Sequence, residues 1–432
     1  MSAIQRRDMG FWSAFALVVN LQLGSAIFLL PRSLSAYGLW GALSWIISGL
    51  GALSLSHIFS VLSNHHPMVG GPHVYIEQAF GKRCGFYAGW TYWVVAWISS
   101  TPLILVGTTA VESIMGDFGV WGRLILQMTV LWSLMSLNIR GAKLSGLGEI
   151  IFSILKVSPL VIIPFLGVRY FDWNILKEPT EIPVFSALSS ASLMTFWGFV
   201  GLEAGTTIAD CVKNPKIIIP RALFWGTLLV VILYFINTIS IFGIVPRSIL
   251  STSDNAYAAL FHQTWGNGWD KAIQVLVCIM CFGSLNSWIL SSGQVALTAA
   301  NSGLFPPIFN QINGQNSPVM GVKITTMCLA ASCALVSLLL YYSQSFSQQI
   351  DIFINLSVSC LILLYVVVIL ALMAFIRKKV IQWSPLLMIS VITSTAFCFW
   401  TITSTHWSML LGAILIPISG YIMARLFRWS VF

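Results

Sequence analysis

Charged residues are scarce in this sequence. Only 8% of its 432 residues are Asp, Glu, Lys or Arg, whereas 57% are apolar, and the mean hydropathy is +0.86. Soluble domains carry about 25% charged residues, so the composition excludes an ordinary soluble domain and predicts an integral membrane protein whose partner is the lipid bilayer. The apolar runs are about 20 residues long and do not alternate as barrel strands do, which predicts membrane-spanning helices.

Other signals are missing as well. Met1 to Asp8 is short and polar, and the first apolar run has no small-residue cleavage site, so we expect no cleaved signal peptide. We find no cluster with metal-ligand spacing and no nucleophile–base pair within the apolar runs, which predicts no metal, no cofactor and no intramembrane enzyme. The net charge of +9 lies in short loops, which argues against a nucleic-acid partner.

Twelve apolar segments are long enough to span a bilayer. Lys and Arg residues divide unevenly between their loops, with fifteen on the side of the two termini and six on the other side. Cytoplasmic loops carry the excess of Lys and Arg, so we expect both termini in the cytoplasm and the protein in a plasma membrane. The predicted spans cover about 11–32, 38–62, 86–115, 120–138, 148–170, 186–210, 222–245, 271–300, 321–343, 350–376, 382–403 and 407–427.

Two spans carry helix-weakening residues at their centres. The first contains Gly24, Ser25 and Ala26, and the sixth has glycines on both sides of Val200, close to Trp197. Interrupted helices at matching places in two halves are typical of inverted-repeat transporters with a site at the bilayer midplane. An unwound turn frees backbone groups that hydrocarbon cannot satisfy, and the amino and carboxylate groups of an amino acid can satisfy them. The alternative is that the glycines only allow close helix packing.

Six separated motifs carry a resemblance that covers nearly the whole chain. They are GSAIFLLP, PMVGGPHVYIEQAFG, TFWGFVGLE, KNPKIIIPRA, GSLNSWILSSGQ and GLFPPIF. With them the sequence resembles the amino acid–polyamine–organocation superfamily, and within it the basic amino acid/polyamine antiporters, most closely the bacterial arginine/agmatine antiporters. The resemblance implies an all-α polytopic protein with twelve transmembrane helices, a LeuT-type fold and discontinuous helices 1 and 6. Residues 1–170 and 171–376 would form a five-plus-five inverted repeat and residues 377–432 two additional helices, and a homodimer would be common among relatives.

The resemblance also implies roles for single residues. Gly24, Ser25 and Ala26 match the interruption that binds the substrate carboxylate through backbone amides. Ala26 replaces a usual glycine and tolerates positive φ poorly, which predicts a slightly reshaped pocket. Trp197 matches an aromatic residue that closes over bound substrate, and Trp288 matches a second one that stacks on the substrate side chain.

Five further residues complete the predicted site. Val200 lies in the sixth-span interruption and is expected to contact substrate. Ser100 replaces an Asn that touches the far end of the substrate in arginine/agmatine antiporters, which leaves ornithine, lysine or smaller substrates open. Glu203 matches an acidic residue used in gating and proton sensitivity, Tyr92 a tyrosine that hydrogen-bonds to it, and Tyr75 a tyrosine of the cytoplasmic loop motif.

One cation, Lys156, falls inside a predicted span. A charge there costs about 2.5–3.5 kcal/mol, so a functional reason is expected. In many members of the superfamily a Lys at this place stands where sodium-driven relatives bind an ion, which implies that the Lys156 ammonium ties the fifth span to the first interruption. The alternatives are a side chain that snorkels to the interface and a proton carrier.

Together these features predict a sodium-independent antiporter that exchanges arginine, ornithine or lysine for a related amine or amino acid by alternating access. The face of a Trp ring can hold a cationic side chain without a carboxylate. A proton-coupled permease for neutral or varied amino acids is the alternative within transport, and a nutrient sensor is the alternative outside it.

Overall fold

The computed structural model describes residues 10–65, 71–140, 146–203, 205–206, 212–253, 255–266, 268–313, 317–341, 346–427 and 429. Across these residues the chain is mainly helical, and an isolated β-bridge joins Ile312 to Pro318. Ten helical segments in this part of the chain are long and apolar enough to cross a membrane, and a bent helix pair makes an eleventh. A shorter apolar helix lies where the sixth span is predicted. The all-α, polytopic class is therefore confirmed, and each predicted span overlaps a helix within the described residues.

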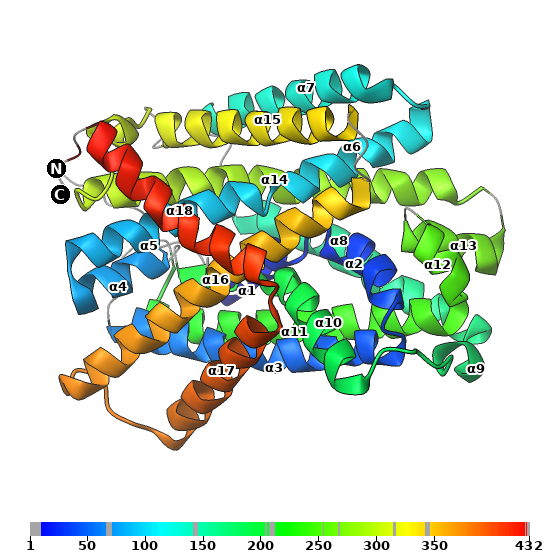
Figure 1. The fold of residues 1–432 in the computed structure, drawn as a ribbon, viewed down its shortest axis with the longest axis horizontal. Helices are drawn as coiled ribbons and strands as arrows, with labels where there is room; N and C mark the ends of the chain where they lie inside the picture. The colour runs from blue at the N-terminus through cyan, green and yellow to red at the C-terminus, as the bar shows by residue number, and fades with distance from the viewer. Residues whose placement is uncertain are drawn as a thin grey trace.

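Figure 1 shows the course of the chain through its helices. In chain order they are α1 (Phe11–Gln22), α2 (Ala26–Ser35), α3 (Leu39–His65), α4 (Pro72–Phe80), α5 (Lys82–Ile98), α6 (Thr101–Met115), α7 (Gly119–Ile139), α8 (Gly146–Gly167), η1 (Val168–Tyr170), α9 (Trp173–Leu176), α10 (Val184–Phe196), η2 (Trp197–Phe199), α11 (Pro215–Ile244), α12 (Arg247–Thr252), α13 (Ala256–Trp265), α14 (Asp270–Asn301), η4 (Pro307–Asn310), α15 (Val319–Tyr341), α16 (Phe346–Arg377), α17 (Pro385–Ser404) and α18 (Trp407–Leu426).

The seventh span begins earlier than predicted. We expect it from residue 222, whereas α11 begins at Pro215, directly after Asn214 in the left-handed conformation (φ 45°). Proline suits the first turn of a helix, because the N–H that it lacks would have no intrahelical acceptor there. The polar, proline-containing stretch that we assigned to a loop therefore starts the helix.

The third span is a single membrane-length unit with a short interruption. Helices α5 and α6 together cover Lys82–Met115, and Ser99 and Ser100 separate them. Pro102 lies in the first turn of α6, where it removes a backbone donor. The Ser100 hydroxyl turns back along the chain and donates to the Ala96 carbonyl at 2.6 Å.

Two groups of helices pack into the body of the molecule. In the first, α3 packs against α10 and α11, and α11 also packs against α1. In the second, α6 packs against α14 and α7 against α15, and α14 contacts α15; α7, α14 and α15 run almost parallel across the upper half of Figure 1. Helices α17 and α18 lie against α16. The first group contains both interrupted spans, and the second presents α14 to them.

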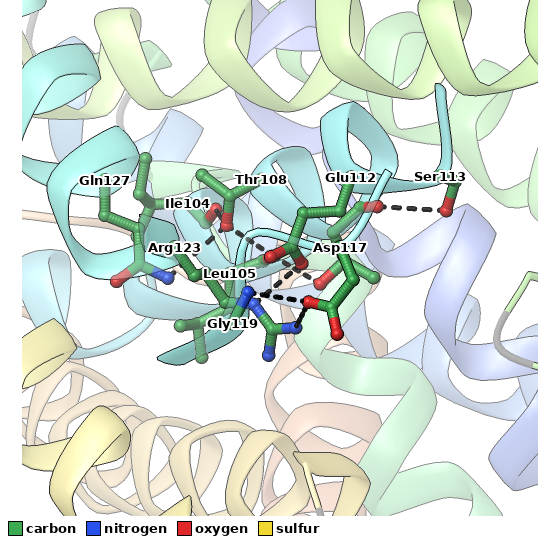
Figure 2. Close-up of polar contacts among 10 residues, drawn as sticks. Ile104, Leu105, Thr108, Glu112, Ser113, Asp117, Gly119, Arg123 and Gln127 are labelled. Atoms are coloured by element: carbon green, nitrogen blue, oxygen red, sulfur yellow. Dashed lines mark hydrogen bonds and ion pairs between the residues drawn. The ribbon is translucent and has the colours of Figure 1, made fainter. Parts of the chain in front are cut away.

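Polar side-chain contacts join α6 to α7 (Figure 2). Arg123 Nε donates to Glu112 Oε2 at 2.7 Å, and Gln127 Nε2 donates to Thr108 Oγ1 at 3.4 Å. The Glu112 side chain is only 7% exposed, so this is a largely buried ion pair that the sequence did not indicate. It fixes the hairpin that supports the second helix group.

Candidate functional site

The first predicted interruption is present. Helix α1 ends at Gln22, α2 begins at Ala26, and the two helices are bent by 42°. Leu23 has extended backbone angles (φ −77°, ψ 92°), so the carbonyls at the end of α1 lose their helical partners. Within a bilayer such groups need other donors, and the protein supplies them.

Three side chains from distant helices satisfy the carbonyls of this turn. Lys156 Nζ on α8 lies 3.3 Å from the backbone carbonyl oxygen of Asn20 and 3.4 Å from that of Leu23. Tyr234 on α11 donates its hydroxyl to the Gln22 oxygen at 2.8 Å. The end of α1 is therefore held open by bonds to α8 and α11 rather than by continued helix.

Ser284 on α14 completes this arrangement. Its hydroxyl donates to the Leu23 carbonyl at 3.0 Å and lies 2.8 Å from Lys156 Nζ. Lys156 is 2% exposed, so its ammonium lies inside the protein instead of reaching to an interface. The expectation that its ammonium links the fifth span to the first interruption agrees with this geometry.

Backbone N–H groups of the same turn lack hydrogen-bond acceptors. Within the described residues, the N–H groups of Ser25, Ala26 and Ile27 donate no hydrogen bond, whereas the Gly24 N–H faces the Tyr234 hydroxyl oxygen. The buried Ser25 hydroxyl also has no partner there. These donors lie at the positive end of the ten-residue helix α2. The arrangement therefore suits a carboxylate.

Ala26 does not distort this turn. Among the described residues other than glycine, only Asn214 and Lys379 have positive φ. Ala26 is the first residue of α2, and a residue in a right-handed helix needs no glycine. The predicted reshaping of the pocket by strain at Ala26 is therefore wrong.

The sixth span is interrupted as well. Helix α10 ends at Phe196, a single 3-10 turn covers Trp197–Phe199, and Val200 is extended (ψ 127°). Gly201 then takes a positive φ of 103°. A Cβ atom at this glycine would lie 2.9 Å from Trp288 Cζ2 and 3.3 Å from the Leu21 carbonyl oxygen. Gly201 thus lets the second interruption approach both α1 and α14, a role that our assignment of site residues missed.

The two interruptions line one small cavity. Its volume is about 30 Å³, and its lining includes all six predicted residues of the two interruptions and α14, namely Gly24, Ser25, Ala26, Trp197, Val200 and Trp288. A buried water needs about 10–15 Å³ by this measure, so the space is much smaller than an amino acid. Both tryptophans are buried. The structure therefore shows a closed form in which cargo enters only after side chains move.

Four residues of the lining were not predicted: Leu21, Leu103 and two polar ones, Gln22 and Ser99. Gln22 reaches the cavity with an amide oxygen that has no partner among the described residues, while its Nε2 donates to Thr227 Oγ1 at 3.1 Å. Ser99 reaches it from the interruption of the third span. Ser100, which we expected there, is not part of the lining and bonds to Ala96 instead. The two-residue break between α5 and α6 sets which serine faces inward, and sequence spacing does not reveal it.

Glu203 lies fully buried just beyond the second interruption. Its Oε2 accepts a hydrogen bond from the Tyr365 hydroxyl on α16 at 2.6 Å. Tyr92 lies close to the same carboxylate, and its hydroxyl is within hydrogen-bonding reach of it. The structure thus brings Tyr92 to Glu203 as expected and adds Tyr365 as the direct donor.

Tyr75 and His73 lie on α4, in the connection between the second and third spans. Both are fully buried; neither ring nitrogen of His73 has a hydrogen-bond partner among the described residues, whereas the Tyr75 hydroxyl lies within reach of Thr206 and Ser63. Burial raises the pKa of Tyr75, and it lowers the pKa of His73 to about 4. Both side chains are therefore neutral at physiological pH.

The described residues contain no group of three or more His, Cys, Asp and Glu side chains that could hold a metal ion. The charged and polar groups near the cavity are instead a lysine, hydroxyls, an amide and free backbone N–H groups. Such a donor set suits a small anion such as a carboxylate, whereas the tryptophan faces suit a cation.

Known proteins are similar to this chain along most of its length. A family model described as amino acid permease matches residues 9–418. The putrescine transporter PotE of Haemophilus influenzae is 30% identical over 381 residues, which cover 84% of this chain and 83% of that protein. PotE of Escherichia coli is 29% identical over 401 residues, or 89% and 87% of the two chains. The cadaverine/lysine antiporter of Escherichia coli is 28% identical over 347 residues, or 77% and 76%.

Proposed function

This chain belongs to the amino acid permease family, and from that premise we propose that it is a sodium-independent antiporter of cationic amino acids and amines. The resemblance to the amino acid–polyamine–organocation superfamily is confirmed by the family match, and the chain is an integral membrane protein. Relatives named for putrescine, cadaverine and lysine support a cationic cargo. The single observation that carries the proposal is the cavity that both interrupted spans share.

The α-carboxylate of an amino acid cargo binds at the start of α2. Three free N–H groups, of Ser25, Ala26 and Ile27, and the Ser25 hydroxyl meet there at the positive end of a helix. The cargo ammonium group finds acceptors on the same cavity wall, where the Gln22 amide oxygen has no partner among the described residues. An amine without a carboxylate would leave the N–H groups to water, so amino acid and amine bind the same site with different contacts.

The cationic end of the cargo lies between Trp197 and Trp288. A cation over a Trp face gains about 0.5–2 kcal/mol, more when it is dry. The cavity lining contains no carboxylate, so the rings hold charge without fixing the length of the side chain. This suits exchange between two cargoes that share a cationic end, and Ser99 leaves room at the wall for ornithine or lysine.

Lys156 replaces a coupling cation. Its ammonium contacts two carbonyls of the α1 terminus and Ser284, which is the coordination that a small monovalent cation would otherwise receive. A permanent cation in this place makes sodium unnecessary for holding the interruption open. Glu203 then acts in gating, through the hydrogen bond from Tyr365 that links the second interruption to α16, with Tyr92 beside it and Tyr75 on the loop side.

The packing supports the five-plus-five inverted repeat, with residues 1–170 and 171–376 as its halves. Exchanging the first span with the sixth and the second with the seventh leaves the main contacts unchanged, since α3–α10 and α1–α11 are both extensive and α3–α11 maps onto itself. Exchanging the third span with the eighth and the fourth with the ninth likewise leaves the main contacts, α6–α14 and α7–α15, unchanged. Residues 377–432 add two helices. We place the protein in a bacterial inner membrane with cytoplasmic termini. We also propose a homodimer, since transporters of this kind often form dimers.

Uptake into proteoliposomes tests the function. Purified protein is reconstituted, and entry of labelled putrescine, ornithine, lysine, arginine and neutral amino acids is measured with and without unlabelled cargo inside, in sodium-free and sodium buffers. We expect uptake of cationic cargo that requires internal cationic cargo and ignores sodium. Uptake that requires sodium and ignores internal cargo would contradict antiport, and preferred uptake of neutral cargo would favour the permease alternative.

One variant links this activity to the site. Trp288→Leu should weaken cationic cargo by about 2- to 30-fold and small neutral cargo much less. Trp121→Leu, at an exposed position of α7 outside the cavity lining, is the matched control and should change neither. Equal losses for cationic and neutral cargo would show that Trp288 does not stack on the cation.

A further inference from the structure

A second hollow lies on the outside of the helix body. It is a groove of about 490 Å³ between α5, α15 and α16. Leu335 and Ile352 in its wall are 52% and 44% exposed, so it opens to the surroundings of the protein rather than to the substrate cavity. Apolar side chains dominate the lining, which consists of Trp97, Ile98, Cys328, Ala331, Ser332, Leu335, Leu339, Gln349, Ile352, Phe353 and Leu356.

Polar groups without partners interrupt this apolar wall. Gln349 is 1% exposed, and neither its amide nitrogen nor its amide oxygen has a hydrogen-bond partner in the described part of the chain. The indole Nε1 of Trp97 on α5 also lacks one. Ser332, in contrast, is satisfied, because its hydroxyl donates to the Cys328 carbonyl at 3.0 Å. A buried amide with neither atom bonded is costly and rare in native proteins, so a group from outside the chain is expected to meet it.

The groove runs inward from one face of the membrane. Gln349 lies in the first turn of α16, and Leu356 lies about 10 Å deeper along that helix. On α15, Leu339 is close to the end of the helix, and Cys328 lies about 16 Å deeper. The polar amide is thus at the shallow end, and the deep part is apolar.

We propose that this groove is a specific site for one membrane phospholipid. One acyl chain lies along Cys328 to Leu339 and Gln349 to Leu356. A glycerol ester carbonyl accepts a hydrogen bond from Gln349 Nε2, and a donor of the headgroup meets Gln349 Oε1. Trp97 precedes Ser99 of the substrate cavity by two residues, so the bound lipid buttresses the wall of the transport site.

Photochemical labelling in nanodiscs tests the site without relying on transport. The full chain is placed in bilayers of phosphatidylethanolamine and phosphatidylglycerol with a trace of phospholipid that carries a diazirine in its acyl chain, and labelled peptides are mapped by mass spectrometry. We expect labelling concentrated on the two groove segments. Ala331→Trp, which fills the groove from an exposed position, should remove most of it, whereas Ala396→Trp at an exposed position of α17 should not. If Ala331→Trp does not fold, Leu335→Trp in the groove replaces it, and Leu415→Trp on α18 is its control. Both leucines are 52% exposed.

The polar contact is tested by lipid retention. Gln349→Leu should lower the affinity for co-purified phospholipid, measured by native mass spectrometry, by about two- to tenfold, with the thermal unfolding temperature in lipid not raised. Uniform labelling over all lipid-facing helices would overturn the proposal, and so would labelling that leaves the two groove segments unmodified. Unchanged retention together with higher stability of Gln349→Leu would show that no headgroup meets the amide.

Discussion

At the scale of single residues, the site depends on one glycine as much as on the aromatic residues that sequence motifs draw attention to. Gly201 combines a φ of 103° with close approach to Trp288 and to the Leu21 carbonyl. Gly24, which the motif highlights, has neither property, since a Cβ there would meet only Leu103 Cδ2 at 3.4 Å. The sequence reveals that a break is present, but backbone angles decide which glycine is indispensable.

A pair of alanine substitutions separates these two glycines. Gly201→Ala should destabilise the protein by about 1–2 kcal/mol from the left-handed backbone alone, and should also displace the Trp288 ring and weaken cargo binding. Gly24→Ala is the control and should leave the unfolding temperature nearly unchanged. Thermal unfolding in detergent and equilibrium cargo binding measure the two effects. Equal stability of the two variants would contradict the role assigned to Gly201.

His73 predicts how stability depends on pH. Its pKa is lowered to about 4 in the folded protein because it is buried without partners. As the pH falls below about 6.5, the unfolded chain binds a proton that the folded chain does not, so the folded state loses about 2 kcal/mol between pH 7 and pH 5 through this residue. His73→Phe should remove that part of the loss in unfolding scans at the two pH values. His65→Phe, at an exposed position of α3, should retain it; a His73→Phe variant that is equally acid-sensitive would refute the explanation.

At the scale of helices, the interruption of the first span is maintained by groups far away in sequence. Its position was predictable, because Gly24 and Ser25 weaken a helix locally. Its partners were only partly predictable: Lys156 stood out as a charge inside a span, whereas Tyr234 and Ser284 are ordinary residues until the fold brings them to the Gln22 and Leu23 carbonyls. Contacts between residues more than 200 positions apart cannot be read from local pattern.

Removing the Lys156 ammonium should therefore either close the turn between α1 and α2 or leave it less well ordered. Lys156→Met has a similar length but no donor, and it leaves the Asn20 and Leu23 carbonyls short of partners at about 1–3 kcal/mol. We expect a lower unfolding temperature and loss of cargo binding that sodium does not restore. The control is Lys323→Met on α15, whose side chain is exposed. Normal binding by Lys156→Met would show that the interruption does not need the ammonium.

At the scale of the whole molecule, the composition predicts an all-α membrane protein and the loop charges predict its orientation in the membrane. The packing of the helices supports the five-plus-five inverted repeat. The twelve spans follow from hydropathy, and errors at their ends come from proline, which starts α11 seven residues early. Closure of the cavity to about 30 Å³ was not predictable, because it depends on how the two helix groups meet.

Orientation can be checked with Cys84. This cysteine is exposed at the start of α5, beside Lys82 and Arg83, on the side that we assign to the cytoplasm. A membrane-impermeant maleimide should label it in inverted membrane vesicles and not in right-side-out vesicles, with Cys84→Ser as the control for the other thiols. Labelling of Cys84 from the outside would reverse the assigned topology.

The central claim is that the two interrupted spans bind the cargo together. An experimental structure of the protein with a bound cationic amino acid tests it most directly. The account predicts the cargo carboxylate within hydrogen-bond distance of the N–H groups of Ser25 to Ile27, and the cationic end between Trp197 and Trp288. Cargo bound elsewhere, with these N–H groups and both rings untouched, would contradict it.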